Sequence, residues 1–443
     1  MSFSRYPEYK DSGVEWLGEI PNHWEISPIK NLALVVNGFP FDSKHFSPEG
    51  RYPLVRIRDL NRSETDTYYD GEFLEAAAIT AEDVLIGMDG DFNVGRWSGQ
   101  GFALLNQRMC CIRGHTPLLS RLIEYALPFP LKAINEITYS TTVKHLSSFQ
   151  VQKTFVALPP SMEEQTAIAA FLDRETSKID ELVAEQEKLI ELLKEKRQAV
   201  ISHAVTKGLD PNARMKDSGV EWLGEVPAHW EVQLLKRAFR SSDYGISDSL
   251  SPDGNIAVLR MGNIQNGQIV KDDLKFTDEV PDELLLEDGD LLFNRTNSLD
   301  LVGKVGLFNV DGSQPTSFAS YLVRLRVRES YCPGYFSYLL NTPGILGEAR
   351  SLAFVAIGQC NLNPTRYGQL VVAIPPPEEQ QDIARFLDKE SGQLDALIAE
   401  AQCAIDLLKE RRSVLISAAV TGKIDVRGLV DALSFSPSQT RAE

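Results

Sequence analysis

Basic residues, cysteines and long apolar runs are all scarce in this chain of 443 residues. The chain has 45 Lys and Arg against 62 Asp and Glu, and its net charge of −17 argues on its face against nucleic acid as a partner. The five cysteines form no CxxC pair, so a reduced compartment is expected and a zinc site is not. No apolar run approaches a membrane span, and the first residues lack the pattern of a signal peptide. These absences predict a cytoplasmic protein that holds no metal.

Sequence motifs of catalysis are missing as well. The chain has no glycine-rich cofactor loop and no GxxxxGK(S/T) phosphate loop, so neither methyl transfer nor nucleotide hydrolysis is expected. Residues 363–367 read NPTRY, which lacks the second proline of an NPPY motif. A nuclease-like pattern of Asp253, Asp273 and Lys275 could hold magnesium, but the first half of the chain does not reproduce it. We interpret it as turn chemistry and coincidence, and expect the chain to be non-catalytic.

An internal repeat is the main positive feature of the sequence. Residues 10–30, KDSGVEWLGEIPNHWEISPIK, recur at 216–236 as KDSGVEWLGEVPAHWEVQLLK. The copies contain Trp16 with Trp24 and Trp222 with Trp230, which we interpret as aromatic plugs against the ends of long helices; a docking surface is the alternative. One copy directly follows the first long helix, whereas none follows the second. The N-terminal copy is therefore expected to occupy the equivalent place there and to bring the termini close together.

Two long helices are predicted, at 160–208 and 375–422. Both begin with prolines and then acidic residues, which suit the first turn of a helix. Each should contain about 40 residues, on the order of 60 Å at 1.5 Å per residue. Apolar residues step by alternating threes and fours, which is typical of a coiled coil, so the two helices are expected to pair with each other. The predicted seam consists of Ile168, Leu172, Ile179, Leu182, Leu189, Leu193, Val200, Ile383, Leu387, Leu394, Leu397, Leu408 and Leu415.

Two variable regions, about 26–158 and 232–373, share a framework but not a surface. In each, a turn precedes a predicted strand (54–61 and 258–265), and a short buried strand follows later (83–86 and 290–293). The loops after the buried strand diverge completely, reading GMDGDFNVGRWSGQG in one region and NRTNSLDLVGKVG in the other. Short strands, glycine-rich loops and some helix predict an α+β globule for each region.

Together these blocks resemble the specificity (S) subunits of type I restriction–modification systems over essentially the whole chain. The resemblance is carried by the duplicated KDSGVEWLGE(I/V)PxHWE, by the proline–EEQ–FLD start of each long helix and by its KE(K/R)R…ISxAVT end. It implies an α+β fold with two globular α/β target recognition domains, separated by two long antiparallel coiled-coil helices and related by a pseudo-twofold internal repeat. The expected segments are 1–158 for the first motif and domain, 159–209 for the central helix, 210–373 for the second motif and domain, 374–425 for the C-terminal helix and 426–443 for a tail.

The resemblance further implies a DNA sequence-recognition subunit that is not itself an enzyme. Each domain would read one half of a bipartite, asymmetric site, and the helices would set the spacer. The implied partners are double-stranded DNA, two methylation (M) subunits and, in the full complex, restriction (R) subunits. The chain would bind no cofactor itself, while the M subunit would use S-adenosylmethionine and the R subunit ATP with magnesium. The alternative is a coiled-coil scaffold that binds only proteins.

Reading base edges requires donors such as Arg, Lys, Asn and Gln on loops that reach the major groove. Arg56 and Arg260 are equivalent positions, better suited to phosphate contact or structural pairing than to base choice. Because the helices and the tail carry much of the acidic excess, binding by the chain alone should be weak without partners that add basic surface. The candidate contacts are Arg56, Arg58, Asn93, Arg96, Gln107, Lys144, His145, Arg260, Asn263, Asn294, Arg295, Asn297, Lys304, Gln359 and Asn361.

Overall fold

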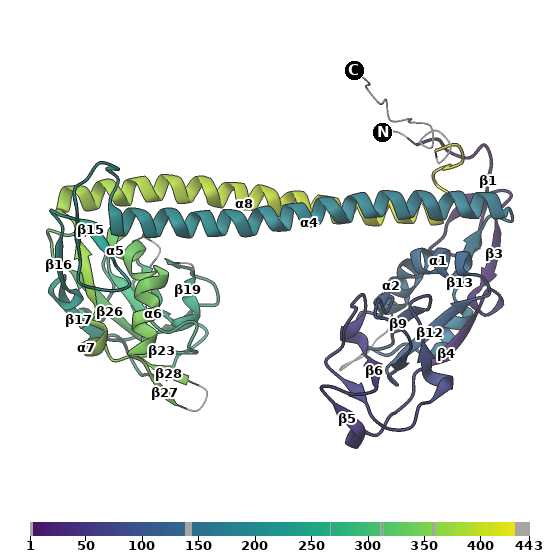
Figure 1. Cartoon of the computed structure of the whole chain (residues 1–443), viewed down its shortest axis with the longest axis horizontal. Helices are drawn as coiled ribbons and strands as arrows, with labels where there is room; N and C mark the ends of the chain where they lie inside the picture. Colours follow the sequence, from purple (N-terminus) through teal and green to yellow (C-terminus); the bar gives the residue numbers. More distant parts are fainter. Residues whose placement is uncertain are drawn as a thin grey trace. The chain divides into compact units, whose positions relative to one another are not determined.

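The computed structural model describes residues 3–137, 144–265, 267–310, 312, 314–356 and 359–429. The chain folds into two compact units: a first unit of Met1–Gln186 with Cys403–Glu443, and a second unit of Glu187–Gln402. Each unit holds a mixed α/β domain together with a stretch of two long helices, α4 (Met162–Lys207) and α8 (Pro377–Val420) (Figure 1).

The domain of the first unit is built from short strands and helices. Before α4 the chain forms β1 (Tyr9–Asp11), β2 (Glu19–Pro21), β3 (Glu25–Pro28), β4 (Ala33–Asn37), β5 (Phe46–Ser47), β6 (Tyr52–Val55), β7 (Tyr68–Tyr69), β8 (Ala78–Ile79), β9 (Val84–Gly87), β10 (Val94–Gly95), β11 (Ala103–Leu105), β12 (Met109–Gly114), α1 (Pro117–Ala126), α2 (Pro128–Ile137), α3 (Ser148–Lys153) and β13 (Phe155–Leu158). One sheet has the order β10-β9-β12-β4 and another the order β5-β7-β6-β11-β8. The strands β9 and β12 lie inside the first sheet, and their apolar runs are buried.

The domain of the second unit is built in the same way. Between α4 and α8 the chain forms β14 (Met215–Asp217), β15 (Glu225–Pro227), β16 (Glu231–Leu234), β17 (Phe239–Tyr244), β18 (Ile256–Leu259), β19 (Ile264–Gln265), β20 (Gln268–Ile269), β21 (Lys275–Thr277), β22 (Leu291–Asn294), β23 (Thr296–Asn297), β24 (Val305–Leu307), β25 (Thr316–Phe318), β26 (Leu322–Val327), α5 (Pro333–Leu340), α6 (Pro343–Ser351), β27 (Phe354–Ala356), β28 (Gln359–Asn361), α7 (Pro364–Tyr367) and β29 (Val371–Ile374). The strand orders are β17-β26-β22-β24-β20-β19, β21-β18-β25 and β23-β28-β27.

The two domains repeat one framework. The order β4-β12-β9-β10 corresponds to β17-β26-β22-β24, and the parallel pair β6–β11 corresponds to the parallel pair β18–β25. In each domain the strand before the long helix pairs with the last strand of the repeated motif, β13 with β3 and β29 with β16. The predicted α+β class and internal repeat are therefore confirmed.

Two predicted strands are shorter than expected. The strands over 54–61 and 258–265 were expected to be continuous, but β6 ends at Val55 and β18 at Leu259, and a 3₁₀ turn follows each. The side chain of Asp59 accepts the backbone N–H of Arg56 at 2.9 Å, and Asn263 Oδ1 accepts that of Arg260 at 2.8 Å. These bonds cap the turn locally and compete with strand pairing.

The long helices exceed the expected length, with 46 residues in α4 and 44 in α8. Each ends at a glycine in the left-handed region, Gly208 (φ +76°) and Gly422 (φ +68°), where an L side chain would be strained. The helices run antiparallel. In the first unit Asp180 pairs with Arg412 (2.8 Å), and in the second unit Arg197, further along α4, pairs with Asp395, earlier in α8 (3.3 Å).

The predicted seam is one residue out of phase in the middle of both helices. Leu182, Leu189 and Leu397 are 45%, 42% and 47% exposed, so they do not form a buried seam. The neighbouring positions Val183, Ile190 and Ile398 are half-buried or buried instead, whereas the other predicted seam residues are buried or half-buried as expected. After Ile179 and Leu394 the buried stripe takes a step of four where the prediction took three, which keeps it on one face of a helix with 3.6 residues per turn.

A helix clasp holds the start of each long helix. Trp24 donates its indole N–H to Glu164 at 2.9 Å, and His23 lies 2.9 Å from the same carboxylate. In the second unit Trp230 donates to Glu379 at 3.1 Å, and His229 lies 2.8 Å from it. Trp24 and Trp230 are both buried, while Trp16 and Trp222 pack partly buried against the cores. The interpretation of the motif as an aromatic plug is confirmed.

The N-terminal segment packs against the end of α8 within the first unit. The Tyr9 hydroxyl donates to the carbonyl of Gly422 at 3.0 Å, and the backbone N–H of Asp425 donates to the carbonyl of Ser4 at 2.8 Å. Arg427 lies over the ring of Tyr6, 4.9 Å from its centroid. The predicted placing of the N-terminal copy at the end of the second helix is confirmed.

Candidate nucleic-acid interface

The predicted contacts of the second unit gather after its central strand. Asn294 ends β22, Arg295 follows it, and β23 then pairs with β28, with Thr296 opposite Asn361. Arg295 donates to Asn361 Oδ1 at 3.3 Å, and its guanidinium lies 4.9 Å from the ring centroid of Tyr244. Within the second unit, β23, β27 and β28 form the edge farthest from α4 and α8 (Figure 1). Five predicted residues are thus brought together here, namely Asn294, Arg295, Asn297, Gln359 and Asn361.

Two asparagines of the predicted set are buried, and their side chains hydrogen-bond to the backbone of neighbouring loops. Asn263 donates from Nδ2 to the carbonyls of Val270 (2.8 Å) and Asp272 (2.9 Å). Asn294 donates more weakly to the carbonyl of Met261 at 3.4 Å and accepts from Asn297 at 3.4 Å. In this arrangement their amides hold loop backbone and do not face solvent.

The equivalent arginines Arg56 and Arg260 also hold loops. The guanidinium of Arg56 donates to Thr67 Oγ1, and that of Arg260 donates to Asp273 Oδ2 at 2.9 Å. The hydrogen bond from Arg260, followed by the charge of Lys275, lowers the pKa of the Asp273 carboxyl. Of the two roles considered for these arginines, the geometry supports structural pairing.

In the first unit a bridge between Asp89 and His145 occupies the place of the β23–β28 pair. His145 Nδ1 lies 2.7 Å from Asp89 Oδ1, and Arg108 lies 3.4 Å from the other oxygen of that carboxylate. Lys144 donates from Nζ to both oxygens of Asn135, at 2.7 and 2.9 Å. The adjacent Gln107 is exposed, and so is Asn93 after β9.

Arg96 and Arg58 differ in how strongly their guanidinium groups are held by contacts within the first unit. Arg96 pairs with Glu124 at 2.7 Å and donates to the carbonyls of Ala81 and Glu82, so it staples a loop to α1. Arg58 is 55% exposed and makes only long contacts to Asp59 (3.9 Å) and Asp66 (3.6 Å). Arg58 can therefore swing toward a ligand at little cost.

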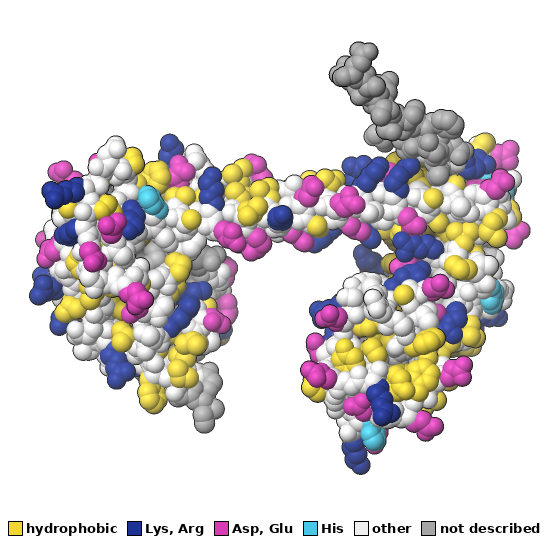
Figure 2. Space-filling view, viewed as in Figure 1, with side chains coloured by type: hydrophobic (Ala, Val, Ile, Leu, Met, Phe, Trp, Pro, Cys, Tyr) yellow, Lys and Arg dark blue, Asp and Glu magenta, His cyan; other side chains and the backbone are white. Residues whose placement is uncertain are grey.

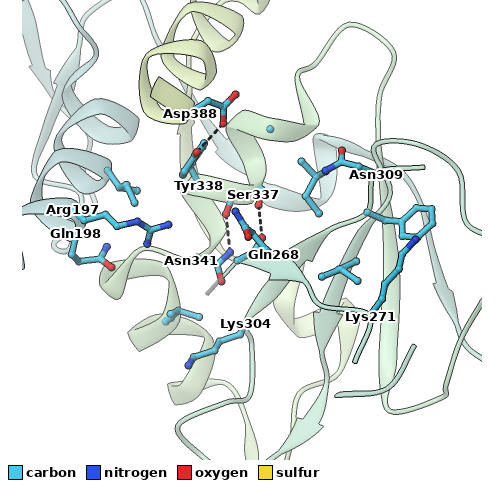
Figure 3. Close-up of a pocket in the computed structure, with 17 residues that line it drawn as sticks. Arg197, Gln198, Gln268, Lys271, Lys304, Asn309, Ser337, Tyr338, Asn341 and Asp388 are labelled. Carbon is cyan, nitrogen blue, oxygen red and sulfur yellow. Dashed lines mark hydrogen bonds between the residues drawn. The ribbon is translucent and has the colours of Figure 1, made fainter. Parts of the chain in front are cut away.

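Lys304 lies apart from the other candidates. Its backbone pairs with Asn294, but its side chain lines a cavity beneath the long helices of the second unit (Figure 3). In the first unit the corresponding region carries acidic side chains instead.

Several exposed side chains at these loops were not predicted. Arg108 directly follows Gln107 between two buried strands, and that position could have identified it. Phe354 and Val355 on β27 are 68% and 64% exposed, although their apolar sequence is typical of a buried strand. Tyr321 and Phe102 are exposed as well. Aromatic faces beside amide donors are suited to stacking on bases or to contact with a thymine methyl group.

On the face drawn in Figure 2, charge is mixed on both domains. In the view of Figure 2, basic and acidic side chains are interspersed on each domain and do not gather into one large basic patch. Attraction of phosphates by this chain alone should therefore be weak. Within the described ranges, no group of three His, Cys, Asp or Glu side chains could hold a metal ion, and no helix is long and apolar enough to cross a membrane.

Comparisons with known proteins agree on one family. A family model described as the type I restriction modification DNA specificity domain matches residues 21–192. The chain is 28% identical to the EcoBI specificity subunit of Escherichia coli, covering 96% of this chain and 91% of that one. It is 23% identical to the MjaVIII specificity subunit of Methanocaldococcus jannaschii, covering 93% of this chain and 95% of that one.

A solved structure gives the same result for the fold. A chain from a study of assembly and conformational transition of the type I R-M system matches with a TM-score of 0.67 at 16% identity, covering 90% of this chain and 98% of that one. The comparisons confirm the resemblance predicted from the sequence, to the specificity subunits of type I restriction–modification systems.

Proposed function

We propose that this chain is the DNA-recognition subunit of a type I restriction–modification complex in the cytoplasm of a prokaryote. It reads a bipartite site, one half with residues 1–158 and the other with residues 210–373. The carrying observation is that the two domains repeat one framework but place different side chains at its end: His145 Nδ1 lies 2.7 Å from Asp89 in one, and Arg295 donates to Asn361 at 3.3 Å in the other. Different side chains at the same place in two matching frameworks predict two different half-sites.

The contact set follows from exposure at these ends. Residues that bond to the loop backbone, such as Asn263 and Arg260, stabilise the loops that carry the proposed contacts. Side chains that reach solvent, or that bond neighbouring groups at the same edge, can exchange those bonds for base edges or phosphates. The proposed contacts are Arg58, Asn93, Gln107, Arg108 and His145 in the first unit, and Arg295, Asn297, Gln359 and Asn361 in the second.

The chain itself supplies no catalytic group in this proposal. Two methylation subunits add methyl transfer with S-adenosylmethionine, and restriction subunits add ATP- and magnesium-dependent cleavage. They also contribute the basic surface that the chain lacks, since its net charge is −17.

The long helices set the spacer between half-sites. Each rises about 1.5 Å per residue, so deletion of one heptad removes about 10 Å, close to three base pairs at about 3.4 Å each. Deleting one heptad from both α4 and α8 should shorten the methylated spacer by about three base pairs. An unchanged spacer in a folded complex would contradict the proposal that helix length sets the spacer.

The decisive experiment is co-expression with the genomic methylation partner, followed by mapping of methylated bases by single-molecule sequencing. A single split, asymmetric motif supports the proposal and gives its sequence. A stable, cofactor-competent complex that methylates no site would favour a scaffold that binds only proteins.

A further inference from the structure

A cavity of about 700 Å³ lies in the second unit, between its domain and the long helices (Figure 3). Arg197 and Gln198 reach it from α4, Tyr338 from α5 and Asp388 from α8. Lys304, Lys271 and Gln268 line it from strands and loops of the domain. A volume of this size is in the usual range for small ligands.

Several polar groups in this cavity are already used to build its wall. Tyr338 donates its hydroxyl to Asp388 at 2.8 Å, and burial, then this bond, raises the pKa of the Tyr338 phenol. Asn341 donates to the carbonyls of Val305 (2.9 Å) and Ser337 (2.8 Å). The acid of the cavity, Asp388, is thus committed to the Tyr338 phenol.

The remaining donors face the cavity. Among the described residues, the Lys304 amine and the Gln268 amide make no hydrogen bond or ion pair. The Nε of Arg197 is buried and 3.3 Å from Asp395 but is not aligned for a hydrogen bond to it. The Lys271 amine lies 5.5 Å from the ring centroid of Phe308. With Asp388 bonded to Tyr338, the Lys304 amine and the Arg197 guanidinium favour an anionic ligand.

The equivalent cavity of the first unit, about 460 Å³, has the opposite charge balance. The same tyrosine–aspartate bond is present there, between Tyr125 and Asp173 at 2.7 Å. However, Arg121 and Glu124 on α1 stand where Gly334 and Ser337 stand on α5, and two basic residues face four acidic ones among the lining residues. Because the frameworks match, side chains alone make only the second cavity suitable for an anion.

We propose that the cavity of the second unit binds the phosphate of a nucleotide unit, with Lys304, Gln268 and Arg197 as its donors. Lysine and arginine are the usual partners of phosphate, and the apolar wall of Ile269, Leu307 and Phe308 accommodates the uncharged part of the ligand. The phosphate can come from the bound DNA strand, in which case the inference rests on the proposed function, or from a free nucleotide.

Two measurements distinguish these sources. The first titrates the full chain with ATP by calorimetry; the second follows duplex binding by the chain with its methylation partner as a function of salt. Lys304→Gln should weaken ATP binding at least fivefold, or make the plot of log affinity against log salt shallower by about 0.9, the value for one phosphate. Gln268→Glu should cause a larger loss in the same measurement, because it adds a negative charge.

Lys275→Gln is the matched control, since it removes the same charge from the same domain outside the cavity, where Lys275 lies 3.9 Å from Asp273. It should change neither measurement. The inference is overturned if Lys304→Gln changes neither, or if Lys275→Gln changes the same measurement equally, with circular dichroism showing that both variants are folded. If the complex methylates no site, the proposed function fails while the ATP titration still tests the cavity.

Discussion

The two units hold their long helices with the same contacts, but they differ in the side chains that line the cavity next to those contacts. Both have the tryptophan–histidine–glutamate clasp, a tyrosine–aspartate bond and an arginine–aspartate pair between α4 and α8. Close to these shared contacts, Glu124 of the first unit occupies the place of Ser337 in the second. The lining of the first cavity is mostly acidic among its charged residues, whereas that of the second is mostly basic. The contacts that position a domain are therefore repeated residue by residue, while nearby surfaces diverge freely. This separation allows one duplicated framework to present two different surfaces.

The largest effect should come from exchanging one of the divergent surfaces. Replacing residues 26–158 with the equivalent region of a relative should change one half-site completely and leave the other intact, because the clasp at Glu164 is retained. Methylation mapping of the co-expressed complex measures this. The reciprocal exchange of residues 232–373 is the control, and a change in both half-sites after either exchange would contradict independent reading.

Removing the clasp tryptophan should affect the two units differently, because the two tryptophan motifs are connected to the helices in different ways. Trp24→Ala and Trp230→Ala should each destabilise their own unit by about 3–5 kcal/mol, since a large buried side chain is lost. The motif at 216–236 follows α4 in the chain, whereas the N-terminal segment that contains residues 10–30 meets the end of α8 only through non-covalent contacts, such as those of Ser4 and Tyr9. Hydrogen exchange should therefore show greater release of the N-terminal motif in Trp24→Ala.

Trp24→Phe and Trp230→Phe provide the control for that comparison. They keep an aromatic ring but remove the N–H that donates to Glu164 or Glu379, so a smaller loss is expected. Equal release of both motifs in the alanine variants would show that the covalent connection makes no difference.

The phase of the helix seam can be tested with adjacent residues in the second unit. Ile190→Ala should cost about 2–4 kcal/mol because Ile190 is 7% exposed, whereas Leu189→Ala should cost less than about 1 kcal/mol. Chemical denaturation of the two variants measures the difference. A reversed order would restore the seam position first predicted for Leu189.

The smallest effect concerns acid sensitivity after the long helices. Asp425 in the first unit and Asp210 in the second each accept the backbone N–H two residues on, at 3.0 and 2.9 Å, but Asp425 also pairs with the Arg427 guanidinium at 2.7 Å. Burial raises the pKa of Asp425, but the hydrogen bonds and charge of Arg427 outweigh burial and leave that pKa below its ordinary value.

A lowered pKa stabilises the fold above the unfolded value, about 3.9, and this stabilisation is lost as pH falls below it. Because Arg427 is partly exposed, the effect should stay below about 1 kcal/mol. Pepsin should cleave near residues 420–429 more readily as pH falls from 5 to 3, and Arg427→Asn should flatten that dependence. A steep dependence in Arg427→Asn would assign the sensitivity to another group.

Much of the framework was predictable because it depends on local patterns. Proline, acidic residues and a final glycine bound each long helix, and the repeat of 10–30 at 216–236 identified the clasp motif before its contacts were known. The step from Ile179 to Val183 was missed because Leu182 is equally apolar, so hydrophobicity alone could not choose between adjacent positions. The exposed Phe354 and Val355 were missed for the converse reason, since an apolar strand is usually buried.

By itself, the sequence determined the family resemblance, the α+β class, the two long helices and the duplication, since motifs, periodicity and repeats are properties of the chain. Only the tertiary structure decided which candidate side chains face solvent and which support loops. Asn263 and Asn361 have the same chemistry, but the first is buried under a loop and the second lies on an edge ribbon. The charge of the cavity at Lys304 was equally undetermined, because it arises from residues of α4, α5, α8 and the domain strands that only folding brings together.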